Sequence, residues 1–280
     1  MCWSAPVAAS FAAFEFVSLV IIACRVRYAA AKWRGPADLW ILPLLSTILA
    51  IELLEAIAWG LDVVDPLPTD EEALEVYTCP WANVVITRIA LIPIALQPFC
   101  AVLPIWGTAP PNGSNSRETF KLPLLSAGLV SIGIIASLVV GELFGDSTPA
   151  VAVQPLSCTN SLGFAADQTC TFIGAHGHLH WTLRMSMSWL SPGGFAYAVA
   201  MVVPVFFARP FAPVGMPFLI FLGIFAALIV RMGGSFEAAS VWCWSALALI
   251  LYFVLYPYVL AVYPERRARA GDKVQALIVA

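Results

Sequence analysis

The stretch from Trp40 to Gly60 (WILPLLSTILAIELLEAIAWG) constrains the fold most, because it is long enough to cross a bilayer and yet carries two carboxylates. A spanning helix needs about 20 mostly apolar residues, and an ionisable side chain near its middle costs about 2.5 to 3.5 kcal/mol on insertion scales. Glu52 and Glu55 share one helical face, which Leu45, Ile48, Trp59 and Asp62 continue. We therefore expect both glutamates to face protein or water rather than lipid.

Other apolar blocks of similar length follow one another along the whole chain. The 280 residues are 61% hydrophobic and only 11% charged, whereas a soluble domain has about 25% charged residues. This composition predicts an all-α, polytopic membrane protein with about seven transmembrane helices and the lipid bilayer as its main partner. The expected spans cover residues 6–23, 40–60, 81–106, 122–144, 185–208, 213–230 and 239–262. They form one domain over residues 1–264, followed by a short basic tail over residues 265–280.

Basic residues in short loops mark the cytoplasmic side of a membrane protein. Here they follow the first, third and fifth spans and fill the tail, at Arg25, Arg27, Lys32, Arg34, Arg117, Lys121, Arg209, Arg266, Arg267, Arg269 and Lys273. The loop after the second span carries acids and no base between Asp62 and Glu75. This asymmetry predicts an external N-terminus and a cytoplasmic C-terminus, in the plasma membrane or another membrane of the secretory pathway. The same placement of bases indicates no nucleic-acid partner.

Four cysteines fall on the external, oxidising side of this topology, where they permit two disulfides. They are Cys2, Cys79, Cys158 and Cys170. The sequence does not give their connectivity, and free thiols are the alternative. A bond from Cys79, at the start of the third span, to the long fourth loop would anchor that loop.

Small residues recur every four positions along the fourth expected span, at Gly133, Ser137, Gly141 and Gly145. Such a ridge lets a neighbouring backbone approach closely. We interpret it as a packing surface.

The third span carries a stripe of polar side chains at membrane depth, formed by Asn83, Thr87 and Gln97. Arg88 lies one step round the helix and about 10 Å below its outer end, because an α-helix rises 1.5 Å per residue. Glu55 lies at a similar depth in the second span.

An ion pair of Arg88 with Glu52 or Glu55 is therefore available, and Glu15, near the middle of the first span, competes for the arginine. One arginine cannot neutralise three carboxylates, so at least one glutamate should be protonated or face a hydrated cavity. The alternative is a structural ion pair that only fixes helix register. The candidate ion-binding or substrate-binding residues are Glu15, Glu52, Glu55, Asn83, Thr87, Arg88, Gln97 and His178.

All three histidines lie in the segment His176-Gly177-His178-Leu179-His180 at the external start of the fifth span. In an extended segment they share a face and permit a metal site with three nitrogen ligands, for which His178 and His180 are the main candidates. If a helix has already begun, only His176 and His180 lie on the same face. The alternative to a metal site is that the histidines cap the start of the helix or bind water there. A retinal Schiff base is excluded, because Lys32, Lys121 and Lys273 lie outside the expected spans. Any other cofactor is unknown.

Scattered motifs resemble those of an uncharacterised family of seven-span membrane proteins from algae and large DNA viruses. They are the start Met1-Cys2, Ala9-Ser10-Phe11-Ala12, the glutamate-rich second span, Cys79 followed by Asn83, Thr87 and Gln97-Pro98, Gly177-His178-Leu179 followed by Trp181, and Trp242-Cys243-Trp244-Ser245. Trp3 departs from the family's usual start. The resemblance carries no known activity, but it implies that His178 matters more than the flanking histidines and that the stripe on the third span is a functional surface.

The surplus of intramembrane carboxylates favours one function over two others. We expect transport or permeation of a small cation or a proton through an outer-facing polar cavity. The first alternative is a membrane-embedded, metal-dependent hydrolase that uses the cluster His176-His180. The second is a seven-span receptor or scaffold with a structural polar interior, whose partner is a small-molecule ligand. The oligomeric state is unknown.

Overall fold

The computed structural model of this chain describes residues 4–29, 37–66, 78–109, 117–144, 169–173, 179–185, 187, 195–207 and 246–258. In this part of the chain, four helices are long and apolar enough to cross a membrane, which confirms the first four expected spans. They are α1 (Ala5–Tyr28), α2 (Asp38–Gly60), α4 (Trp81–Thr108) and α5 (Lys121–Phe144). Two shorter helices, α6 (Phe195–Phe207) and the helix Ala246–Tyr258, fall inside the fifth and seventh expected spans. The sixth span and the basic tail lie outside the described residues, so the number of spans and their orientation stay predictions.

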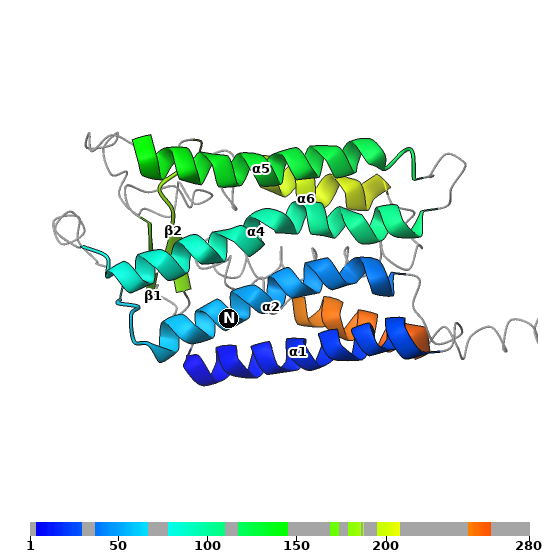
Figure 1. The fold of residues 1–280 in the computed structure, drawn as a ribbon, viewed down its shortest axis with the longest axis horizontal. Helices are drawn as coiled ribbons and strands as arrows, with labels where there is room; N and C mark the ends of the chain where they lie inside the picture. Colours follow the sequence, from blue (N-terminus) through cyan, green and yellow to red (C-terminus); the bar gives the residue numbers. More distant parts are fainter. Residues whose placement is uncertain are drawn as a thin grey trace, which may run out of the picture.

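The long helices lie side by side, and each runs opposite to the one before it (Figure 1). α2 packs between α1 and α4, α5 packs on α4, and α6 contacts both α4 and α5. The ends of α2 and α5 therefore meet the start of α4 at one end of the bundle, where a β-hairpin lies (Figure 1). We call this the hairpin end. We call the opposite end the Arg25 end, after a buried residue in the last turn of α1.

The hairpin consists of β1 (Cys170–Ile173) and β2 (Leu179–Thr182), which pair in antiparallel register with Thr171 opposite Trp181. The chain after α2 adds to the free edge of β1, through a parallel bridge between Pro66 and Ile173. The Ile173 N–H donates to the Asp65 carbonyl at 2.8 Å. β1 is therefore bonded along both of its edges, to β2 and to the chain after α2, at the end of a helical bundle.

The fifth span does not begin as a helix where we predicted. We expected a helix from Met185, but Met185 and Met187 are not helical, and the helix is described from Phe195. The Met187 N–H donates to Ser137 Oγ of α5 at 2.8 Å, so this backbone group is bonded to a side chain of another element. Pro192-Gly193-Gly194, directly before α6, is a sequence typical of a break in regular structure.

The chain that follows the hairpin packs closely against the small residues of α5. This confirms the close backbone approach predicted for this ridge. A Cβ built on Gly141 would lie 2.4 Å from the Arg184 carbonyl oxygen, so no larger residue fits there. One turn earlier, Ser137 bonds the Met187 amide. The neighbour on the ridge is thus a non-helical segment rather than another helix.

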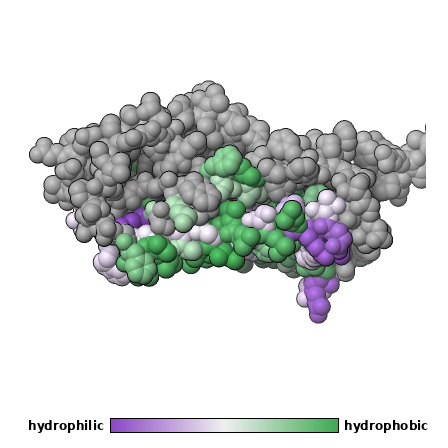
Figure 2. Space-filling view, turned by 90° about the horizontal axis from the view of Figure 1, so that it is seen from above, coloured by the Kyte–Doolittle hydropathy of each residue, from purple (hydrophilic) through white to green (hydrophobic). Residues whose placement is uncertain are grey.

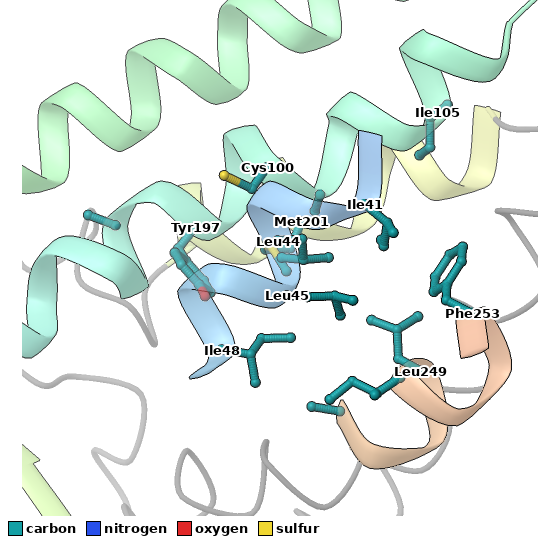
Figure 3. Packing of buried hydrophobic residues seen from close by; sticks show 14 of the residues in the cluster. Ile41, Leu44, Leu45, Ile48, Cys100, Ile105, Tyr197, Met201, Leu249 and Phe253 are labelled. Atoms are coloured by element: carbon teal, nitrogen blue, oxygen red, sulfur yellow. The ribbon is translucent and has the colours of Figure 1, made fainter. Parts of the chain in front are cut away.

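Apolar side chains fill the interior and also cover the outside of the bundle. The largest buried cluster joins α2, α4, α5, α6 and the helix Ala246–Tyr258, with Ile41, Leu44, Leu45 and Ile48 of α2 at its centre (Figure 3). Outward-facing residues of α5 are also apolar, among them Leu122, Leu125, Leu129 and Ile132. Among the described residues that Figure 2 shows, hydrophobic ones fill the middle and hydrophilic ones lie toward the two ends. Such a surface fits lipid and indicates an integral membrane protein.

Candidate functional site

Three buried carboxylates lie on the first two helices, α1 and α2. Glu15 belongs to the face of α1 that also buries Ala12 and Ser18, and it is 2% exposed. On α2, Glu52 is 0% and Glu55 is 3% exposed. All three point away from the lipid surface, as expected for charged groups on spanning helices. We call Glu15, Glu52 and Glu55 the carboxyl cluster.

The carboxyl groups of Glu15 and Glu52 interact electrostatically across the contact between α1 and α2. Neither oxygen of Glu15 has a hydrogen-bond partner among the residues that the structure describes. The only buried guanidinium in this part of the chain, that of Arg25, is engaged at the far end of α1. A buried carboxyl without a partner requires a proton, a cation or water to offset its desolvation.

Asn83 and Thr87, two of the candidate binding residues, both bind the hairpin. The Asn83 carboxamide donates from Nδ2 to the Thr171 carbonyl at 2.7 Å and accepts from the Thr171 N–H at 2.8 Å. It thereby pairs with β1 as a neighbouring strand would. The same Nδ2 donates to the Val63 carbonyl at 2.8 Å. Thr87 Oγ1 lies 2.7 Å from Thr171 Oγ1 and donates to the Asn83 carbonyl at 2.8 Å.

Arg88 does not pair with Glu52 or Glu55, and this corrects the expected ion pair. Its guanidinium instead binds the carboxylate of Glu142 on α5, and its side chain is 46% exposed. Glu142 also accepts a hydrogen bond from Thr169 Oγ1, which in turn accepts from the Arg184 N–H at 3.0 Å. The pair joins α4, α5 and the start of the hairpin. Sequence reasoning missed Glu142, although an acid in the last turn of the fourth span, at the same end as Arg88, was a usable signal.

A disulfide between Cys79 and Cys170 completes this end of the bundle, with Cα atoms 5.9 Å apart. It confirms that Cys79 anchors the long loop, and it settles one of the pairings that the sequence left open. Cys2 and Cys158 lie outside the described residues. The disulfide, the Asn83 carboxamide and Glu142 fix β1 at its beginning and its middle.

Gln97, the third member of the polar stripe, is separated from the other two. The hydroxyl of Tyr197 on α6 donates to Gln97 Oε1 at 2.6 Å, and both residues are buried. The Nε2 group of Gln97 has no hydrogen-bond partner among the described residues. The stripe thus divides into a structural part at the hairpin and a partly satisfied amide deeper in the bundle.

The histidine segment is described only at its end. His180 lies in β2 opposite Phe172, so the extended alternative is right for this residue. His176 and His178 lie outside the described residues. No group of three or more His, Cys, Asp or Glu residues able to hold a metal occurs in the part of the chain that the structure describes. The metal site stays a prediction.

Arg25, which we assigned to a cytoplasmic loop, is in fact a buried residue of α1. Its guanidinium binds Asp38 of α2 through two hydrogen bonds of 2.7 and 2.6 Å. It also donates to the carbonyls of Phe253 and Val254, both at 2.7 Å. Pro257 has no N–H, so the Phe253 carbonyl loses its usual helical partner and accepts from Arg25 instead. One side chain therefore joins α1, α2 and the helix Ala246–Tyr258.

Comparison with known protein families, with curated proteins and with solved structures finds no match to this chain.

Proposed function

We propose that this integral membrane protein transports or conducts a small cation or a proton, which binds at Glu15 and Glu52, with Glu55 one turn of α2 nearer the hairpin end. The observation that carries the proposal is the Glu15 carboxyl, 2% exposed and without a hydrogen-bond partner among the described residues. A charged group at this depth is costly, and such groups in spanning helices commonly mark ion or proton pathways.

The surroundings of the cluster support a cationic ligand. Glu15 and Glu52 interact electrostatically, so a positive charge between them relieves repulsion. Asn83, Thr87 and Arg88 fasten the hairpin, and we therefore remove them from the proposed ion-binding set. The acidic loop after α2 would attract cations to the hairpin end, which the proposed orientation places outside.

The test is cation and proton uptake into liposomes that contain the purified protein, under imposed gradients of each ion. Glu15→Gln combined with Glu52→Gln removes both charges and preserves the side-chain shapes, and we expect it to abolish uptake. Glu118→Gln is the matched control, because Glu118 is an exposed carboxylate that pairs with Lys121 at the Arg25 end. Uptake that survives the double substitution, or folded wild-type protein without uptake, would refute the proposal.

A further inference from the structure

The buried faces of α1 and α2 around Glu15 carry few polar groups. One helical turn further along α1 lies Ser18, whose hydroxyl donates to the Phe14 carbonyl of its own helix at 2.8 Å. On α2, the buried residue one turn before Glu52 is Ile48. An ionised carboxylate only accepts hydrogen bonds and therefore needs donors. Among the described residues, none donates to Glu15.

Asp38 shows what a buried carboxylate on the same pair of helices requires. It is 2% exposed, as Glu15 is, but the guanidinium of Arg25 donates two hydrogen bonds to it. The two carboxyl groups are thus equally excluded from solvent, and they differ in that Asp38 has a cationic donor. Because an ionised group without a partner is very costly in an apolar interior, such a group normally becomes neutral instead. The contrast with Asp38 favours a proton on Glu15.

The surroundings of Glu15 suit a metal cation less well. Calcium takes about six to eight oxygen ligands, and magnesium and zinc require octahedral and tetrahedral sets. Alkali-metal ions likewise exchange their hydration shell for several oxygens. The described residues contain no group of three or more His, Cys, Asp or Glu able to hold a metal, so Glu15, Glu52 and Glu55 do not converge on one metal position. A proton needs a single oxygen.

We propose that the cation bound at Glu15 is a proton rather than a metal ion, so that this residue is a carboxylic acid at neutral pH. The inference names the substrate of the site, and it rests on the proposed function for the movement of that proton across the membrane. The proton comes from water and adds to one carboxylate oxygen of Glu15. Its release to water restores the carboxylate, so no further reactant is required.

Other titratable groups on the elements packed against α1 define what the proton on Glu15 responds to. Among the described residues they are Asp38, Glu52 and Glu55 of α2 and the tyrosines of the helix Ala246–Tyr258. Asp38 is engaged with Arg25, whereas Glu52 interacts electrostatically with Glu15. A negative charge on Glu52 favours the neutral, protonated form of Glu15.

The test is infrared absorption of the whole protein in lipid at neutral pH, in the region of the C=O stretch of protonated carboxylic acids. Exposed glutamates are ionised at this pH and do not contribute. We expect a band that shifts in heavy water, is lost in Glu15→Gln and persists at saturating sodium, potassium, calcium or magnesium. Glu118→Gln is the matched control, because it replaces an exposed carboxylate by the same amide and should leave the band unchanged.

A second variant keeps the assignment testable if Glu15→Gln does not fold. Glu15→Asp retains the acid on a shorter side chain, so its band should move in frequency. A band that stays unchanged in Glu15→Asp, or remains in Glu15→Gln, would overturn the inference, because the proton would then belong to another group. Absence of the band in wild-type protein would overturn it as well. So would its disappearance on addition of a metal cation, because the metal would then occupy the site.

These results can be separated from those of the uptake experiment. A band that is lost in Glu15→Gln supports the proton on Glu15 even if liposomes take up no protons, and the proposed transport would then fail alone. Metal uptake that depends on Glu15 and Glu52, in protein without the band, would sustain transport and refute the proton.

Discussion

The two ends of the bundle are held by different chemistry. At the hairpin end, a disulfide and several neutral hydrogen bonds spread over Asn83, Thr87 and Thr171 secure a non-helical segment. At the Arg25 end, a single guanidinium makes four hydrogen bonds of 2.6 to 2.7 Å that join three helices.

The difference follows from what each end must satisfy. Buried backbone outside a helix needs a partner for every N–H and C=O, so the hairpin end requires many small contacts. Helices satisfy their own backbone, and the Arg25 end needs only a partner for a carbonyl that Pro257 leaves free and a charge for Asp38. We therefore expect stability to be distributed at the hairpin end and concentrated at the Arg25 end.

The largest expected effect is that of Arg25→Met. Removing one partner of a buried ion pair typically costs about 3 to 5 kcal/mol of unfolding free energy, because the other charge keeps its desolvation penalty. Equilibrium unfolding in mixed detergent micelles measures this. Lys121→Met is the control, because the Lys121–Glu118 pair at the same end is exposed and should contribute about 0 to 1 kcal/mol. If Arg25→Met matched this control, stability would not be concentrated at Arg25.

Replacing Cys79 and Cys170 together by serine should have the next largest effect. The disulfide closes a long loop, with a sequence separation of 91 residues, and removal of such a bond typically costs about 2 to 4 kcal/mol. The same unfolding measurement applies, and helix content by circular dichroism should stay unchanged. Cys24→Ser is the matched control, since Cys24 is an exposed free cysteine. A loss of helix content would show that the disulfide supports the bundle and not only the hairpin.

Asn83→Ala should cost less, about 1 to 3 kcal/mol, because it leaves buried backbone groups of Thr171 and Val63 without their partner. The effect should be local. Hydrogen exchange of the Thr171 amide should accelerate while the helices keep their protection. Ser46→Ala is the control, because the exposed Ser46 hydroxyl bonds only the Leu42 carbonyl of its own helix. Uniform loss of protection would contradict the view that this end is held by separable contacts.

The sequence predicts the first four long helices and the burial of Glu15, Glu52 and Glu55 for the same reason. Apolar length and the exclusion of charge from lipid are local rules, which need no knowledge of neighbouring helices. The hairpin was missed because β1 and β2 are only four residues long, which is too short for an alternating pattern to separate a strand from other structure. Arg25 was read as a loop residue because the apolar run ends at Ala23, whereas α1 continues to Tyr28.

The sequence offered Glu142 as a possible partner of Arg88 but did not favour it over Glu55, because the choice depends on which helix lies beside which face of α4. The depth of Arg88 in its helix is compatible with an ion pair to Glu55 on α2. The arginine instead binds Glu142 on α5. Periodicity places residues on a common face and leaves the order of helices around the bundle open. The same limit applies to Gln97, whose partner Tyr197 comes from a helix 100 residues further along the chain.

The smallest expected effect is that of Arg88→Met, and it separates the two roles of Glu142. The pair lies at the rim, with side-chain exposures of 46% for Arg88 and 16% for Glu142, so its loss should cost about 0 to 1 kcal/mol. Glu142→Gln should cost more, about 1.5 to 3 kcal/mol, because it also weakens the charged acceptor of the buried Thr169 hydroxyl. A double-mutant cycle on unfolding free energy measures both. Equal effects of the two substitutions would mean that the ion pair itself, and not the bond to Thr169, holds α5 to the hairpin, and one charged contact would then dominate each end.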